Sequence, residues 1–282
     1  MPTIRSLGNV CALSLALLAS APFLHAQRKL TDDDINFRKE VFVGKGTNAR
    51  LPYRLFVPTG YDATRKYPLV LWLHGGTGSG SDNVRQLGNQ NQLATHFWIS
   101  ESVQSRFPVF VMAPQCPFGK IWAEPEFNIP SECLKLTISA LVKVEKDFSI
   151  DPNRIYVGGQ SMGGDGVWSL LQNYPEIWAA AIVMSAYDNF TEPAAIARIP
   201  LWVFQGDADA SVPVGTVRTM MDQLKKLHAN LRYTEYHKTD HEVWNKAFAE
   251  PGLVDWLFSQ KRSSFDTPPA SQLGSGTPPH SR

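Results

Sequence analysis

Cysteine and surplus charge are both scarce in this sequence, and each scarcity excludes a class of protein. Only 3 of the 282 residues are cysteine, too few for a small domain held together by a disulfide framework. The formal net charge is only +1, and no basic stretch stands out, so a nucleic-acid partner is not expected. Any ligand of this protein should therefore be neutral or nearly so.

Long apolar runs are also rare, and the main one lies at the N-terminus. It covers residues 10–24, which is short for a helix that spans a bilayer. Arg5 precedes this run, and Ala26 supplies the small residue that signal peptidase requires before its cut. The layout predicts a signal peptide over residues 1–26 that is cleaved after Ala26, and hence a secreted or periplasmic protein without a stable membrane anchor. The alternative is an N-terminal anchor that is retained.

Cleavage at that site would leave a mature chain with balanced charge and two thiols. Arg5 and Cys11 would be removed with the leader, so 26 basic and 26 acidic residues would remain. In an oxidising compartment, Cys116 and Cys133 would be able to form a disulfide. Two buried free cysteines are the alternative, because sequence alone does not give the separation of their Cα atoms.

Beyond the leader, short apolar runs bounded by glycine and proline alternate with longer helical stretches. The composition, 43% hydrophobic and 19% charged, is that of a globular protein with a substantial core. Predicted strands cover residues 53–57, 68–73, 108–113, 154–158, 179–184, 201–205 and 231–236. Predicted helices cover residues 131–148, 162–174, 214–228 and 253–260. This alternation predicts an α/β fold with a mostly parallel central sheet and helices on both faces, which places ligands at the carboxyl ends of the strands.

A single domain accounts for these elements. We assign it to residues 37–262, after a linker over residues 27–36. The last stretch, residues 263–282, is rich in serine, proline and glycine and has little to bury, so we predict a disordered tail. Nothing in the sequence indicates an oligomeric state.

The strongest motif joins a predicted strand to a predicted helix. It is Gly159-Gln160-Ser161-Met162-Gly163, a G-x-S-x-G pattern in the context that this nucleophile motif requires. The turn is so tight that a Cβ on either side of the serine would collide with backbone. We therefore predict Ser161 as a nucleophile and the Met162 backbone N–H as a donor to a developing oxyanion. The alternative is a glycine-rich strand exit with a capping serine.

An earlier strand ends in a second glycine-rich loop, HGGTGSGS at residues 74–81. Loops at this position supply the other backbone donor of an oxyanion hole, and we assign that donor to Gly76, with Thr77 as the alternative. A phosphate-binding loop is excluded, because a Walker motif requires lysine where this chain has Ser81. His74 is interpreted as a residue that orients the backbone, although a base is the alternative.

Two later strands end in loops that carry carboxylates and a histidine. The first loop holds Asp207 and Asp209. Asp207 is closer to the strand and is interpreted as closing the turn through its own backbone. The second loop holds His241, the candidate general base, which would take the serine proton and return it to the leaving group. His237 and His228 are alternatives that lie earlier in the chain.

The chain order serine, acid, histidine is that of α/β-hydrolases, and the sequence resembles one branch of them. The segments that carry the resemblance lie between residues 53 and 260 and read YPLVLWLHGG, VFVMAPQCP, IDPNRIYVGGQSMGG, GDADASVP and HEVWNKAF. They resemble the feruloyl esterase and polyhydroxybutyrate depolymerase-like branch, which includes predicted peptidases and phospholipase/carboxylesterases. The resemblance implies an ester hydrolase without cofactor or metal, and it favours Asp209 over Asp207 as the acid. The sequence departs from that pattern at Asp240, where glycine is expected before the histidine.

Three further residues are candidates for contact with a substrate. They are Trp122, Trp244 and Gln160, which fall near the same sheet edge. Aromatic walls with a few polar groups are usual for small-molecule sites. The alternative is that the tryptophans only pack the loops.

Together these features predict a secreted serine hydrolase of carboxylic esters. The expected substrate is a small-molecule or polymer-borne ester with an acyl or feruloyl group, cleaved through an acyl-enzyme on Ser161 with Asp209 and His241. A peptidase of the prolyl-oligopeptidase type is the first alternative, but this chain is short for the propeller of that family. An inactive hydrolase fold that only binds its ligand is the second.

Overall fold

The computed structural model describes residues 36–124 and 129–262. The predicted signal peptide with Cys11, all of the linker except Asn36, and the predicted tail lie outside these residues. Within the two described ranges, no helix is both long and apolar enough to cross a membrane.

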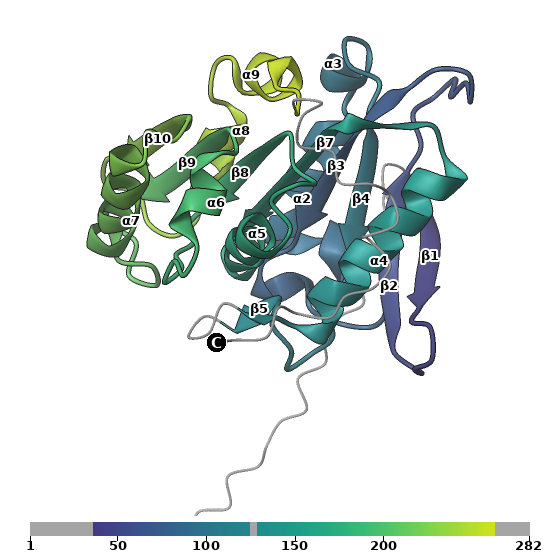
Figure 1. Ribbon diagram of the computed structural model, residues 1–282, viewed down its shortest axis with the longest axis horizontal. Coiled ribbons are helices and arrows are strands. Elements are labelled where there is room, and N and C mark those ends of the chain that lie inside the picture. The colour runs from purple at the N-terminus through teal and green to yellow at the C-terminus, as the bar shows by residue number, and fades with distance from the viewer. Residues whose placement is uncertain (1–35, 125–128, 263–282) are drawn as a thin grey trace, which may run out of the picture.

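An eight-stranded sheet forms the centre of the molecule (Figure 1). Its spatial order is β1-β2-β4-β3-β7-β8-β9-β10. The strands are β1 (Phe37–Val43), β2 (Arg50–Phe56), β3 (Tyr67–Leu73), β4 (Phe110–Pro114), β7 (Ile150–Gln160), β8 (Ala180–Met184), β9 (Leu201–Gly206) and β10 (Leu231–Tyr236). From β4 to β10 every neighbouring pair is parallel, whereas β1 and β2 pair antiparallel at one edge. The predicted fold class is confirmed.

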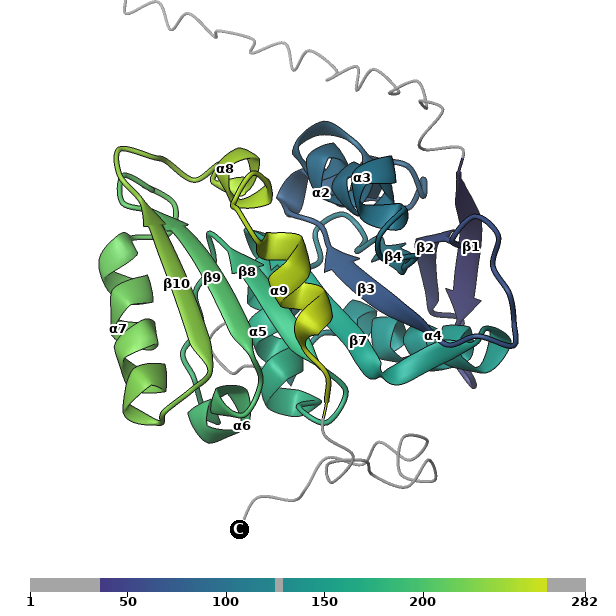
Figure 2. The same ribbon diagram turned by 90° about the horizontal axis from the view of Figure 1, so that it is seen from above.

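Helices cover both faces of this sheet (Figure 2). One face carries α4 (Glu132–Asp147), α5 (Met162–Asn173), α6 (Pro193–Ala197) and α7 (Val214–Lys226). The other carries α2 (Gln92–Ile99), α3 (Glu101–Gln104), α8 (Trp244–Phe248) and α9 (Leu253–Ser259). Successive side chains of a strand point to opposite faces, so Leu71 packs in the first core and Trp72 in the second.

Some elements were not predicted. Strand β1 reads FRKEVFV and is largely exposed, as an edge strand is, so no buried apolar run marks it. The hairpin of β5 (Ala123–Glu124) and β6 (Ile129–Pro130) and helices α2, α3, α6 and α8 are short, and short elements carry little periodic signal.

The two cysteines of the domain are buried free thiols. Cys116 follows β4 and Cys133 lies in the first turn of α4. Of the two alternatives that the sequence left open, the structure therefore has the free thiols and not the disulfide.

Candidate active site

Ser161 lies in a strained turn between β7 and α5. Its backbone has φ 53° and ψ −130°, a conformation that non-glycine residues rarely adopt. A Cβ on Gly159 would come within 2.4 Å of the Gly163 carbonyl oxygen, and one on Gly163 within 2.1 Å of the Leu73 carbonyl oxygen. Both glycines are therefore required for the turn that presents the Ser161 hydroxyl.

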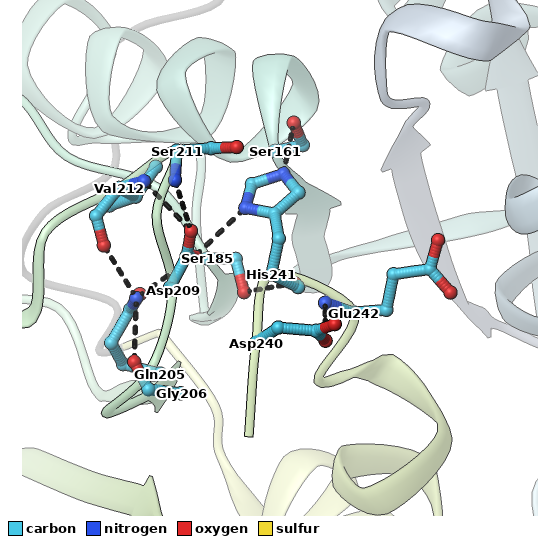
Figure 3. Close-up of polar contacts among 10 residues, drawn as sticks. All are labelled: Ser161, Ser185, Gln205, Gly206, Asp209, Ser211, Val212, Asp240, His241 and Glu242. Atoms are coloured by element: carbon cyan, nitrogen blue, oxygen red, sulfur yellow. Dashed lines mark hydrogen bonds and ion pairs between the residues drawn. The ribbon is translucent and has the colours of Figure 1, made fainter. Parts of the chain in front are cut away.

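The imidazole of His241 bridges Ser161 and Asp209 (Figure 3). Nε2 lies 2.8 Å from the Ser161 hydroxyl oxygen, and Nδ1 lies 2.8 Å from Asp209 Oδ2. A carboxylate can only accept, so Nδ1 carries the hydrogen and Nε2 is left to accept the serine proton. The structure thus brings together three residues that lie up to 80 positions apart in the chain.

Asp209 is held in place by its own loop. Its side chain is fully buried, and Oδ1 accepts hydrogen bonds of 2.8 Å from the backbone N–H groups of Ser211 and Val212. Oδ2 also accepts a bond of 3.1 Å from the Gln205 side chain. With His241 this makes four donors, which fix the direction of the carboxylate.

Asp207 belongs to a different contact, which corrects the interpretation that it closes the turn through its own backbone. Its Oδ2 lies 2.7 Å from His237 Nδ1, and its Oδ1 accepts a 2.6 Å bond from the Lys238 backbone N–H. The hydrogen bond with His237 is the main cause of the lowered pKa of Asp207. The His237 ring is exposed and lies on Asp207. The structure therefore brings neither of them into the hydrogen-bonded set of Ser161.

The glycine-rich loop after β3 lies beside Ser161. A Cβ on Gly75 would be 3.5 Å from the Ser161 Cβ, and Gly76 and Thr77 are exposed. Met162 is the first residue of α5, where backbone N–H groups have no partner within the helix. Met162 therefore directly follows Ser161 in the chain, and Gly76 directly follows the glycine that approaches Ser161.

His74 is buried beneath this loop and orients it, as predicted. Its Nδ1 lies 2.7 Å from the Gly75 carbonyl oxygen, and its Nε2 accepts a 3.0 Å bond from the Cys116 backbone N–H. Nε2 is thus the acceptor and Nδ1 the donor. Burial lowers the pKa of His74 to about 4, so the ring is neutral at neutral pH.

The three predicted substrate contacts are all buried in the structure. Trp122 is fully buried and donates a 3.0 Å bond to the His74 carbonyl oxygen. Trp244 is also buried, and its ring meets the His241 ring edge-on at 5.8 Å. Gln160 is buried and donates a 3.1 Å bond to the Gln90 carbonyl oxygen. All three side chains are covered by protein and contact the residues or loops that form the site.

The departure at Asp240 is accommodated locally. Its Oδ1 accepts a 3.2 Å bond from the Glu242 backbone N–H in the same turn, so the side chain braces the loop that carries His241. The glycine that lets this loop lie close to the end of β9 is Gly206, because a Cβ there would lie 2.3 Å from the Asp240 carbonyl oxygen.

Supporting residues that sequence reasoning missed include Asn91, Ser185 and Gln205. Ser185 and Gln205 stand at or just after the end of a predicted strand, a position that gives a weak signal. Asn91 lies in a polar stretch with no motif. Within residues 36–124 and 129–262, no cluster of three or more His, Cys, Asp or Glu side chains is arranged to hold a metal ion.

Comparisons with known proteins find esterases. Residues 44–250 match the family model described as "Putative esterase". A thermostable esterase of known crystal structure is 35% identical, with a TM-score of 0.77. The match covers 82% of this chain and 64% of that chain, so this chain spans slightly less than two thirds of that relative.

More distant structures share the fold. Esterase 2 of Thermogutta terrifontis, phosphorylated by paraoxon, is 18% identical, with a TM-score of 0.58 over 81% of this chain and 98% of that one. A CE1 ferulic acid esterase of Anaeromyces mucronatus, in complex with ferulic acid, is 18% identical, with a TM-score of 0.57 over 79% and 90%. Among curated proteins, none matches the sequence significantly.

Proposed function

Because this chain belongs to the esterase family, which it matches over residues 44–250, we propose that it is a secreted carboxylic-ester hydrolase with a Ser-His-Asp acyl-enzyme mechanism. The observation that supports this mechanism most is the pair of 2.8 Å contacts that His241 makes with Ser161 and Asp209. Nucleophile, base and orienting acid are the three groups that acyl transfer on a serine requires.

The first half of the reaction forms the acyl-enzyme. His241 Nε2 takes the Ser161 proton as the hydroxyl oxygen attacks the ester carbonyl, and Asp209 stabilises the resulting imidazolium. The carbonyl oxygen becomes an oxyanion, which accepts hydrogen bonds from the backbone N–H groups of Gly76 and Met162. The imidazolium then gives its proton to the departing alcohol, and the acyl group stays on Ser161.

The second half releases the acid. Water attacks the acyl carbon while His241 accepts a proton from it, and the same two backbone donors hold the second oxyanion. Collapse of this intermediate breaks the bond to the Ser161 oxygen, which regains its proton from His241. The products are a carboxylic acid and an unchanged enzyme.

The substrate that we propose is a neutral acyl or feruloyl ester, on a small molecule or on a polymer. The balanced charge of the chain supports a neutral substrate, since a strongly charged ligand calls for an excess of the opposite sign. The likeness to the ferulic acid esterase supports the fold alone. A panel of p-nitrophenyl esters of increasing acyl length, with methyl ferulate and aminoacyl amides beside them, would define the acyl preference.

The Ser161→Ala variant tests the mechanism. We expect kcat on p-nitrophenyl esters to fall by about 10⁶-fold, because loss of the nucleophile in other triads has this effect. An unchanged thermal transition would show that the variant is folded. Retained ester hydrolysis by this variant would place the nucleophile elsewhere. In the original protein, faster turnover of amides than of esters would favour the peptidase alternative.

Secretion is a separate proposal with its own test. It is supported by the signal-peptide layout of residues 1–26. We expect the protein recovered from the periplasm or the medium of an expression host to begin at Gln27, as N-terminal sequencing would establish. Protein that stays in the cytosol with Met1 intact would contradict it.

A further inference from the structure

We propose that Asn91 is a positioning residue that sets the orientation of the Gly76 backbone N–H in the oxyanion hole. This inference rests on the proposed function, since it concerns the same hole. Asn91 is fully buried and ends the short 3₁₀ helix η3 (Asn89–Asn91), directly before α2.

The Asn91 side chain holds the glycine-rich loop on both sides of Gly76. Its Oδ1 accepts a 2.8 Å bond from the Gly75 backbone N–H. Its Nδ2 donates a 3.2 Å bond to the Thr77 hydroxyl oxygen. One amide group therefore restrains the residue before and the residue after the proposed donor.

The two peptide groups that meet at Gly75 are each held at their polar atoms. In the first, Gly75 N–H donates to Asn91, and the His74 carbonyl oxygen accepts a 3.0 Å bond from Trp122 Nε1. In the second, the Gly75 carbonyl oxygen lies 2.7 Å from His74 Nδ1 and 2.9 Å from the Gly78 backbone nitrogen. A trans peptide is planar, so its N–H points opposite to its C=O. Fixing the Gly75 carbonyl thus fixes the direction of the Gly76 N–H.

Packing alone would not hold this peptide. Gly76 is exposed, and a Cβ placed on it would meet nothing within 4 Å. Two consecutive glycines also have wide freedom in φ and ψ. Hydrogen bonds are therefore what keeps the Gly76 N–H in one direction. His74 and Gly78 hold the Gly75 carbonyl oxygen, and Asn91 holds the residues on either side of Gly76.

The segment that carries Asn91 is itself joined to the nucleophile. The Gln90 carbonyl oxygen accepts a 3.1 Å bond from Gln160, the residue before Ser161. Within the segment, the Asn91 backbone N–H donates a 3.0 Å bond to the Gly88 carbonyl oxygen. Asn91 is thus anchored to the end of β7, directly before Ser161. This connection holds the glycine-rich loop in a fixed position relative to the Ser161 hydroxyl.

Two variants test the role, Asn91→Ala and Asn91→Leu, of which the second preserves the side-chain volume. The assay is p-nitrophenyl butyrate hydrolysis, with kcat counted per active site titrated by paraoxon, so unfolded molecules do not enter the rate. Loss of one oxyanion donor lowers kcat by about 10²–10³-fold. For a donor that is misdirected but present we expect about a 10- to 100-fold fall in kcat and a KM within about twofold of the original. The affinity for a boronic acid that forms a tetrahedral adduct should fall with kcat.

Asn83→Ala is the matched control. Asn83 is a buried asparagine of the same connection, but its Nδ2 donates to the Glu40 and Tyr53 carbonyl oxygens, at 2.8 and 3.1 Å, and not to the glycine-rich loop. We expect it to lower the thermal transition and to leave kcat per titrated site unchanged.

The outcomes separate this inference from the proposed function. If both Asn91 variants keep kcat within about twofold, or lose no more than the Asn83 variant, the positioning role is wrong. If Ser161→Ala still hydrolyses esters, the proposed function fails, whatever the Asn91 variants do.

Discussion

The Ser185 hydroxyl donates a 2.7 Å hydrogen bond to the carbonyl oxygen of His241, 56 residues further along the chain. Ser185 follows β8, is fully buried, and has a left-handed backbone with φ 48°, which is uncommon for serine. The preceding residue, Met184, accepts a 2.9 Å bond from the Ser161 backbone N–H. The end of β8 thus joins Ser161 to the loop that carries His241.

Removing that hydroxyl should misplace the base. We expect Ser185→Ala to lower kcat by about tenfold, because a small displacement of a catalytic group is enough to slow the reaction. KM should change little, since Ser185 is buried and does not face a substrate. Steady-state kinetics on a p-nitrophenyl ester measure both constants, and an unchanged kcat would rule out a role for the bond.

The choice between the two carboxylates of the β9 loop can be tested by a matched pair. Asp209→Asn should lower kcat by about 10⁴-fold, because the amide no longer holds His241 in the tautomer that accepts the serine proton. Asp207→Asn, which alters the contacts with His237 and with the backbone of Lys238 and Thr239, should keep kcat within about twofold. A larger loss in the Asp207 variant would transfer the acid role to Asp207. Both variants are compared at one pH on the same ester.

Gly206 allows the His241 loop to lie against β9. A Cβ there would come within 2.2 Å of the Thr239 carbonyl oxygen, so Gly206→Ala should displace the loop, lowering both kcat and the thermal transition. Gly215→Ala is the control, since its Cβ would meet nothing within 4 Å in α7. It should stabilise the protein by about 0.5–1 kcal/mol through helix propensity. Urea unfolding and kinetics on both variants measure the difference, and equal effects would contradict the steric argument.

Buried His74 should make the protein less stable in mild acid. Its pKa falls from 6.5 to about 4 on folding, so between these values the unfolded chain binds the proton and the folded one does not. Stability is lost as pH falls from about 6.5 towards 4, by about 2 kcal/mol at pH 5 for this group. Urea unfolding at pH 7, 6 and 5 should show the stability of the original protein falling relative to that of His74→Asn, which isolates this group from those that titrate in the opposite sense. Parallel pH dependence of the two would refute it.

Asp165, in the first turn of α5, should make the protein less stable as pH rises, the opposite of the effect of His74. Burial, and to a lesser degree the charge of Asp188, raise the pKa of Asp165 to about 7, against a backbone hydrogen bond from Tyr187 that lowers it. The folded state then binds the proton more tightly, so this group's contribution is complete below about pH 4 and lost as pH rises through 7. Asp165→Asn should therefore be more stable than the original protein at pH 8, and the difference should shrink at pH 5. Thermal melts at the two pH values test this, and a constant difference would contradict it.

Local chemistry made much of this protein predictable. The strand, turn and helix around Ser161 lie within one short stretch, and two glycines with no room for a Cβ mark the turn. The buried strands are continuous apolar runs, and α4, α5 and α7 are long enough to show a periodic apolar face. The edge strand β1 and the short helices lack such a signal.

What the residue pattern by itself determined is the fold class and the tight turn that presents Ser161, because both can be recognised in short stretches of the chain. Only the tertiary structure decided that Asp209 and not Asp207 reaches His241. It also decided that the side chains of Trp122, Trp244 and Gln160 are buried beneath the site. The physical reason is that side-chain direction at a loop is set by packing between distant segments. Asp207 and Asp209 have the same side chain, and only the fold determines which histidine each of them contacts.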